Sequence, residues 1–386
     1  MASDGKSPVA GRTLALWEER HERIRRALAY EPVDRIPFTF MGGGYSPVSQ
    51  GLSLAEFCTD ADAAVGAILD CLEDLGDIDG ANQMYRGLTT PGLTALWLSR
   101  IAVPGIDLPD DVVWQVHETE DLTVGDYDRI LDEGWEPVRD ELLGRLQKPE
   151  LVEANDRWVA RSFAGLARRY HERGYDTLCG ATTTIPFEVL CGGRSMARFY
   201  VDCLRMPEKV KAVMDVVQPF YVAHAVRTTA ASGVKSTWVG GWRAASGLVS
   251  PRIWDELVWP YYVDMVTRLH EQGIFSLLHF DQNWDRDVHR FLELPRRSFA
   301  VAFDGMTDIR RAKEILGDHC AFLGDVPSSM LAIGTPDQVR AYVRDLIRDL
   351  GPTGLVMNPG CDVPFNARPE NVRAMVAATH EFGTFA

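Results

Sequence analysis

Short apolar runs alternate with longer amphipathic stretches through the second half of the chain. Each apolar run has the length and composition of a buried strand, and each stretch that follows spaces its apolar residues as a helix does. The predicted strand and helix pairs are 236–239 with 251–272, 274–280 with 286–291, 298–303 with 308–316, 320–323 with 337–350, and 354–358 with 369–382. Strands that alternate with helices of this length predict βα units and a parallel sheet.

The first half of the chain supplies three more candidate strands, at 36–40, 77–79 and 175–180, after a charged helix at 14–30. The strand count then reaches the number that a closed (β/α)₈ barrel needs, so a TIM barrel is the predicted fold. A doubly wound open sheet is the alternative. No Gly-x-Gly-x-x-Gly motif follows the first strand, and the Gly42-Gly43-Gly44 run matches neither a dinucleotide nor a P-loop fingerprint.

Two regions depart from this alternation. Residues 1–12 are polar and are predicted to be a disordered N-terminus, which leaves 13–386 as a single barrel domain. The stretch from about 80 to 160 fits poorly, and we interpret it as an insertion over the barrel mouth, with a helix near 127–132 and another beyond Pro149. A contact between copies of the chain in a homo-oligomer is an equal interpretation of that stretch.

Composition narrows the function classes. The chain has 386 residues, of which 46% are hydrophobic, so it can bury a large core. Its net charge of −15 argues against nucleic acid and anionic membranes as partners, because both need a basic surface. Neither a signal peptide nor a membrane span is recognisable, so a cytoplasmic enzyme is expected. The 7 cysteines form no Cys-x-x-Cys pair, which excludes a zinc ribbon and a thioredoxin motif.

Three residues at predicted strand ends carry the strongest chemical signal. His279 and Asp281 end the fifth strand, where alternate residues face the same side, and Cys361 follows the eighth strand in a Pro-Gly turn. Imidazole, carboxylate and thiolate are zinc ligands, and three protein ligands leave one position open for chemistry. The alternatives are a core histidine and a free loop cysteine. We predict a catalytic Zn²⁺ site at the barrel mouth, where barrel active sites lie.

Further candidates follow other strands. Glu188 is a possible fourth ligand or general acid, although a capping carboxylate is an equal interpretation. Asp304 and Asp325 end strands six and seven, where they could orient a ligand or exchange protons, but Asp beside Gly is also ordinary turn chemistry. An apolar substrate pocket is expected from the aromatic residues Trp238, Trp242, Trp284, Phe40, Tyr45 and Phe187.

Several segments together resemble the uroporphyrinogen decarboxylase superfamily. Residues 22–28 followed by 31–37 are similar to its opening signature. The C-terminal segments 308–317, 334–339, 359–361 and 369–372 match its last βα units, whereas the resemblance is weakest between 80 and 170. The fold that the resemblance implies is a (β/α)₈ barrel, which agrees with the strand count.

The superfamily has two chemistries. True decarboxylases carry Arg-x-x-x-Arg after the first strand to hold porphyrin carboxylates, whereas residues 40–46 here contain no arginine. The zinc-dependent methyltransferases of the other branch carry His-x-Cys after strand five and a cysteine after strand eight. This chain matches at His279 and Cys361 and differs at Asp281, where a carboxylate makes the metal harder and better suited to oxygen ligands.

The segment 279–287 resembles the first methyltransferases of corrinoid O-demethylase systems. That resemblance implies transfer of a methyl group from an aryl methyl ether to the cobalt of cobalamin on a separate corrinoid protein. The chain has no Asp-x-His-x-x-Gly motif of its own for the corrinoid. Methanol, a methylamine and a methyl thioether remain open as methyl donors. The alternative functions are a metal-free decarboxylase of a small carboxylic acid and a non-catalytic binding protein.

Overall fold

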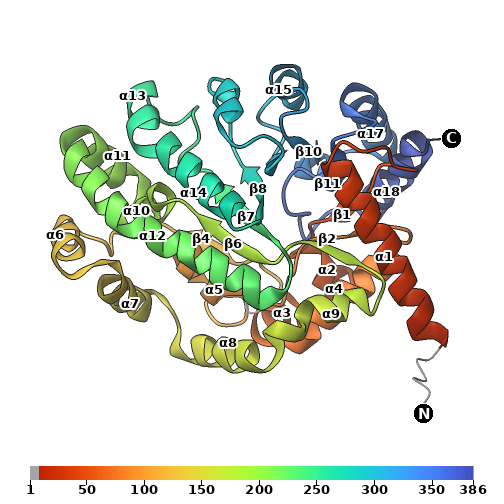
Figure 1. Ribbon diagram of the computed structural model, residues 1–386. Coiled ribbons are helices and arrows are strands. Elements are labelled where there is room, and N and C mark those ends of the chain that lie inside the picture. Colours follow the sequence, from red (N-terminus) through yellow and green to blue (C-terminus); the bar gives the residue numbers. More distant parts are fainter. Residues whose placement is uncertain (1–7, 88, 386) are drawn as a thin grey trace, which may run out of the picture.

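A computed structural model describes residues 8–87 and 89–385, and its centre is a barrel of parallel strands surrounded by helices (Figure 1). One sheet has the order β1-β2-β5 and the other the order β11-β10-β9-β8-β7-β6, and every neighbouring pair in them is parallel. The strands are β1 (Thr39–Phe40), β2 (Gly80–Gln83), β5 (Asp176–Cys179), β6 (Ala181–Thr184), β7 (Ser236–Gly241), β8 (Phe275–Phe280), β9 (Phe299–Phe303), β10 (Ala321–Val326) and β11 (Leu355–Pro359).

The two sheets join at two seams. β5 and β6 are halves of one strand that is interrupted at Gly180, whose N–H donates to Ser236 O of β7 at 3.0 Å. On the other side, Phe38 just before β1 forms a parallel bridge with Met357 of β11. The described strands therefore fill eight positions of a closed ring, and the predicted (β/α)₈ barrel is confirmed.

Helices cover the outside of this ring. After β1 and β2 these are α2 (Tyr45–Ser49), α3 (Leu54–Thr59), α4 (Ala61–Asp74) and α9 (Leu166–His171). After β6 to β8 they are α10 (Pro186–Arg194), α11 (Met196–Arg205), α12 (Pro207–Ser232), α13 (Pro251–Ile253), a π-helical turn (Trp254–Val258), α14 (Trp259–Glu271) and a 3₁₀ turn (Val288–Glu293). The last are α15 (Ile309–Leu316), α16 (Ser328–Ile333), α17 (Pro336–Leu350) and α18 (Pro369–Gly383). The helices after β7, β9, β10 and β11 lie where the sequence predicted them, whereas the short helix predicted at 286–291 after β8 is a 3₁₀ turn.

The poorly alternating stretch holds its own elements. They are α5 (Thr89–Trp97), the antiparallel pair β3 (Arg100–Ala102) and β4 (Gln115–His117), α6 (Val124–Glu133), α7 (Trp135–Leu146), α8 (Pro149–Ser162) and a 3₁₀ turn (Phe163–Gly165). α6 and α8 are the two helices predicted there. β2 lies inside the range 80–160 and belongs to the barrel, so the excursion begins only after Gln83.

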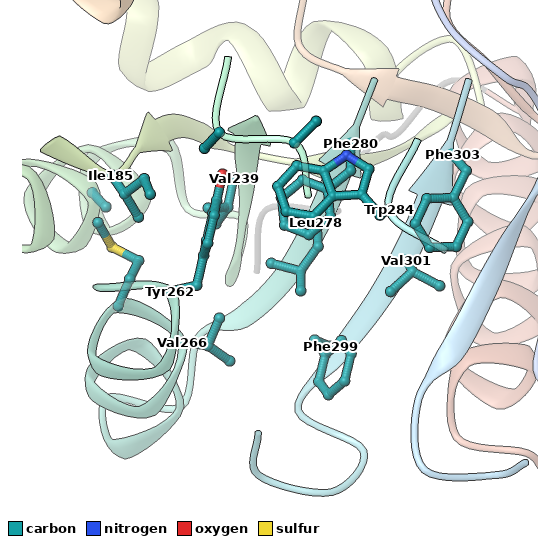
Figure 2. Packing of buried hydrophobic residues seen from close by; sticks show 14 of the residues in the cluster. Ile185, Val239, Tyr262, Val266, Leu278, Phe280, Trp284, Phe299, Val301 and Phe303 are labelled. Carbon is teal, nitrogen blue, oxygen red and sulfur yellow. The ribbon is translucent and has the colours of Figure 1, made fainter. Parts of the chain in front are cut away.

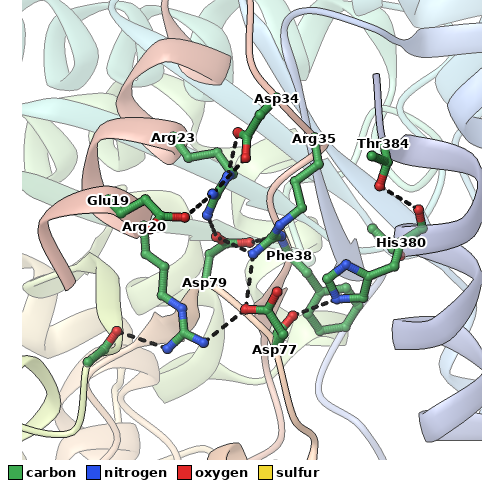
Figure 3. A network of polar contacts seen from close by, with 12 residues as sticks. Glu19, Arg20, Arg23, Asp34, Arg35, Phe38, Asp77, Asp79, His380 and Thr384 are labelled. Carbon is green, nitrogen blue, oxygen red and sulfur yellow. Dashed lines mark hydrogen bonds and ion pairs between the residues drawn. The ribbon is translucent and has the colours of Figure 1, made fainter. Parts of the chain in front are cut away.

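Helix α1 (Pro8–Leu28) lies against one end of the barrel and is fixed by a polar network (Figure 3). Asp79, which is fully buried, accepts hydrogen bonds from Arg23 of α1, from Arg35 and from the backbone N–H of Phe38. Two expectations are corrected here. Residues 8–12 are helical, although they were predicted to be disordered, and residues 1–7 lie outside the described part. The second strand begins at Gly80, because the acids at 77–79 pair with arginines.

Side chains alternate between two apolar clusters. In β8, Leu277 lies in the cluster inside the barrel, whereas Leu278 and Phe280 pack outward against α14 (Figure 2). β9 follows the same rule, with its alanines inside and its Phe and Val residues outside. This period-two pattern fixes which way the next side chain of β8, His279, points. None of the helices in the described part is both long and apolar enough to cross a membrane.

Candidate metal centre

His279 lies near the carboxyl end of β8 at a position that faces the barrel interior. It is 1% exposed, and its ring stacks on Trp238 of β7 with centroids 5.3 Å apart. Asp281 is the next residue on the same side, and its N–H donates to Gly241 O at 3.0 Å, which continues the ladder between β7 and β8. His279 Nε2 and Asp281 Oδ1 are 3.3 Å apart. Local strand geometry therefore brings imidazole and carboxylate together, as the sequence predicted.

Cys361 reaches the same point from β11. The preceding Gly360 donates its N–H to Val326 O at 2.8 Å, and a Cβ at Gly360 would lie 3.2 Å from backbone atoms of Asp304 and Asp325. A residue without a side chain lets the chain pass close to β9 and β10 there. One ligand atom from each of His279, Asp281 and Cys361 lies within 4.8 Å of the others. Two segments far apart in sequence thus converge at one mouth of the barrel.

The donor set fits a tetrahedral zinc ion. Zinc bonds of about 2.0–2.3 Å place tetrahedral ligands roughly 3.3–3.8 Å apart, and the His279–Asp281 separation of 3.3 Å lies in that range. Both ring nitrogens of His279 are buried without a hydrogen-bond partner in the described part of the chain. Buried polar atoms without partners are rare in folded proteins, and a bound metal would satisfy one of these nitrogens.

The Cys361 side chain would be a thiolate only beside a bound cation. Burial and the nearby carboxylates of Asp281 and Asp362 raise the pKa of Cys361 well above its usual range. Without a metal the group is therefore a neutral thiol, whereas a coordinated divalent ion would hold it as a thiolate. Asp281 and Cys361 are both partly exposed, so the cluster is open to solvent on the mouth side.

Two residues that the sequence analysis did not single out lie beside the cluster. Asp362 accepts hydrogen bonds from the backbone N–H groups of Gly43 at 2.6 Å and Gly44 at 3.0 Å, and burial raises its pKa to about 6. The ring of Tyr85 packs on Gly43, where a Cβ would be 3.3 Å from it, and its hydroxyl is buried without a described partner. Asp362 could have been found from the sequence, because it directly follows Cys361. No sequence feature pointed to Tyr85.

Asp304 and Asp325, the two predicted supporting acids, lie in different surroundings. Asp304 accepts hydrogen bonds from Gln282 N at 2.9 Å and Met306 N at 2.8 Å, so it holds the turn directly after Asp281. Burial raises the pKa of Asp304, and the Asp281 carboxylate adds to the effect. Asp325 is buried and accepts a hydrogen bond from the Tyr342 hydroxyl of α17 at 2.7 Å, outside the metal-ligand group.

Glu188 does not join the ligand group. Its Oε1 accepts hydrogen bonds from Trp242 N and Ala244 N, both at 2.8 Å, and its Oε2 accepts one from Arg243 N at 3.1 Å. Burial raises the pKa of this fully enclosed carboxyl, while Arg243 and the three N–H groups oppose that rise. Its oxygens shape the loop after β7. In the described residues the candidate ligand group holds only His279, Asp281 and Cys361.

The predicted aromatic pocket is only partly assembled. Trp238 and Trp242 both meet Trp97 of α5 edge-on, with centroids 6.3 and 6.4 Å apart, and Trp238 faces the metal-ligand group through His279. Trp284 instead lies on the outer face of the barrel, fully buried and stacked on Phe280 (Figure 2). The remaining expected pocket residues, Phe40, Tyr45 and Phe187, are likewise buried in the outer cluster. Expecting Trp284 and these three to line the pocket was therefore wrong.

Comparisons with known proteins agree with this architecture. Residues 136–382 match the family profile "Uroporphyrinogen decarboxylase (URO-D)". The uroporphyrinogen decarboxylase of Methylococcus capsulatus is 25% identical over 374 residues, 92% of this chain and 96% of that protein. The enzyme of the same name from Syntrophotalea carbinolica is 26% identical over 205 residues, 50% of this chain and 57% of that protein. A solved "methyltransferase from Methanosarcina mazei" superposes with a TM-score of 0.70 at 17% identity, covering 94% of this chain and 98% of that chain, which shows a common fold.

Proposed function

The chain belongs to the uroporphyrinogen decarboxylase family, and from this premise we propose that it is a zinc-dependent methyltransferase of that family. The preferred methyl donor is an aryl methyl ether, and the acceptor is the cobalt of a separate corrinoid protein. One observation carries the proposal: His279, Asp281 and Cys361 place their ligand atoms within 4.8 Å of one another at the barrel mouth. A decarboxylase that works without metal has no use for this donor set.

The charge around the cluster also disfavours a porphyrinogen substrate. Asp281, Asp304 and Asp362 surround the site. Burial raises the pKa values of Asp304 and Cys361, and the neighbouring carboxylates add to this rise. The residues after β1 offer glycine N–H groups to Asp362, where true decarboxylases carry arginines. A substrate with several carboxylates would be repelled there, whereas a neutral ether would not.

The residues suggest a division of labour. Bound zinc would act as a Lewis acid toward the ether oxygen and stabilise the departing phenolate. His279, Asp281 and Cys361 would hold the metal and would leave one coordination position for the substrate oxygen. Trp238 fixes the imidazole plane by stacking, and Asp304 fixes the turn after Asp281. The methyl carbon must face outward, because its acceptor belongs to another protein, and the partial exposure of Asp281 and Cys361 provides that access.

Metal analysis tests the proposal first. Wild-type protein reconstituted with zinc and desalted should retain about one zinc per chain, and Cys361→Ala should lose most of it, because the site needs all three protein ligands. Cys320→Ala is the matched control, since Cys320 is a fully buried thiol at the start of β10 and should leave the zinc content unchanged. Wild-type protein that holds no zinc would favour the metal-free decarboxylase or the binding protein.

Asp281→Cys tests the choice of donor. This variant recreates the two-thiolate set of the thiol-methylating branch, so the metal becomes softer and its preference for oxygen ligands falls. With an added corrinoid protein, wild-type enzyme should demethylate a methoxybenzene, and Asp281→Cys should bind zinc but lose at least tenfold in that rate. An unchanged rate in this variant would remove the argument for an ether substrate and leave the metal centre intact.

A further inference from the structure

A cavity lies at the opposite end of the barrel from His279, Asp281 and Cys361, the metal-ligand group. It has a volume of about 330 Å³ and is enclosed by α1 and by the beginnings of β5, β7, β8 and β10. Asp176, Ser236 and Phe275, the first residues of three of these strands, line it, so it opens at the amino ends of the strands. The metal-ligand group lies at the carboxyl ends of β8 and β11.

The floor of this cavity is apolar. Leu277 and Leu323 point into the barrel from β8 and β10, and Leu178 of β5 completes the layer. Ile24 and Leu28 of α1 form the opposing wall. Arg23 ties α1 to Asp34 and Asp79 beside this end of the barrel. Leu178, Leu277 and Leu323 are only 9%, 2% and 1% exposed. An apolar occupant would therefore mainly cover the partly exposed lining residues Leu28, Val234 and Phe275.

Cationic side chains stand around the opening of the same cavity. His21, Arg25, Lys235 and Arg297 line it, and Asp176 is its single lining acid among the described residues. His21 is paired with Asp176 at 3.0 Å, and the two arginines have acidic partners at 2.7–2.8 Å. Lys235 has no acid within ion-pair distance in the described part of the chain. Its charge remains available to an anion, on a protein whose net charge is −15.

We propose that this cavity binds a medium-chain aliphatic carboxylate, with its tail on the leucine floor and its carboxylate on Lys235. The volume lies at the lower end of the roughly 300–1,000 Å³ typical of small-molecule sites, which suits one tail of about eight to ten carbons. A diacyl lipid would not fit. An apolar body with one convergent charged group is the usual composition of such a site. The site is independent of the methyl transfer proposed at the other end of the barrel.

Isothermal titration calorimetry of the full chain with decanoate and with decan-1-ol tests the proposal. Wild-type protein should bind decanoate saturably at one site, and decan-1-ol more weakly, since the alcohol lacks the charge. Lys235→Gln should weaken decanoate binding at least tenfold and leave decan-1-ol unchanged. Lys211→Gln is the matched control, because Lys211 is exposed on α12 and already paired with Asp215, and it should bind both ligands as wild type does.

A second variant examines the location of the tail. Leu28→Trp at the end of α1 fills the cavity from a partly exposed position and should abolish binding of both ligands, with an unchanged circular dichroism spectrum as a measure of intact folding. Absence of saturable decanoate binding to wild-type protein would overturn the proposal. Equal affinity for decanoate in wild type, Lys235→Gln and Leu28→Trp would overturn it as well. None of these outcomes depends on methyl transfer activity.

Discussion

Replacing Asp79 with alanine should destabilise the protein more than removing any other acid of the network in Figure 3. The carboxylate is fully buried and accepts four hydrogen bonds. They come from Arg23 Nη1 at 2.6 Å, Arg35 Nη1 and Nη2 at 2.6 and 3.0 Å, and Phe38 N at 2.8 Å. These bonds join α1 to the segment before β1. That segment in turn pairs with β11 through Phe38 and Met357.

The size of this loss in stability depends on the acidic partners that Arg23 and Arg35 retain without Asp79. Removing one partner from a buried ion pair usually costs about 3–5 kcal/mol, because the remaining charge stays desolvated. Arg23 retains Asp34, and Arg35 retains Asp77 at 3.2 Å, which reduces the loss at each guanidinium. The N–H of Phe38 loses its acceptor outright, at about 1–3 kcal/mol for a buried donor. The reduction at the two guanidinium groups and the added cost at Phe38 N roughly offset each other. We therefore expect Asp79→Ala to lower the free energy of unfolding by about 3–5 kcal/mol.

Urea unfolding followed by tryptophan fluorescence measures this loss as a shift of the midpoint at constant slope. Asp34→Ala is the control, because its carboxylate also bonds Arg23 but its side chain is 65% exposed, so solvent screening limits its contribution to about 1 kcal/mol or less. Equal midpoints for Asp79→Ala and Asp34→Ala would refute the reasoning, since burial would then make no difference to the ion pair.

Three further outcomes are expected. Burial raises the pKa of Asp325 to about 6, so the folded state binds its proton more tightly than the unfolded state, and the folding free energy weakens by about 2–3 kcal/mol as the pH rises from 4 to 7. Asp325→Asn should remove most of that slope in pH-dependent urea titrations, and a slope identical to wild type would contradict it. Trp284→Ala should lose about 3–5 kcal/mol in the same urea assay by leaving a cavity against Phe280, and a loss below about 1 kcal/mol would argue against a core role. Trp238→Leu should weaken zinc about tenfold in chelator competition by freeing the His279 ring, provided that its thermal unfolding matches wild type.

The parts of the site that the sequence predicted follow from strand periodicity. Alternation in β8 determines that His279 faces inward, and the first residue beyond the strand on that side is Asp281. The side of a loop residue is not determined in this way. Trp284 lies only three residues farther, but there the chain has turned over the outer face, and its Nε1 donates to the carbonyl of Asp281.

The roles of the buried carboxylates could not be predicted, because the sequence does not show which hydrogen-bond donors will surround them in the fold. Glu188 lies on a helix whose own N–H groups do not bind it, and its partners come from a loop more than 50 residues away. Asp79 follows Ile78, and the sequence predicted a strand over 77–79, but Arg23 of α1 and Arg35 in the segment after α1 donate hydrogen bonds to its oxygens. Both acids are explained by tertiary contacts alone.

The interruption at Gly180 and the single bridge at Phe38 divide the barrel wall into two arcs. Every candidate ligand sits on the larger arc, at the ends of β8 and β11. Gly43 and Gly44, which clamp Asp362, and Tyr85 follow strands of the smaller arc. The three candidate ligands thus depend on one arc alone, while the hydrogen bonds from Gly43 and Gly44 to Asp362 tie the loop that carries Cys361 to the other arc.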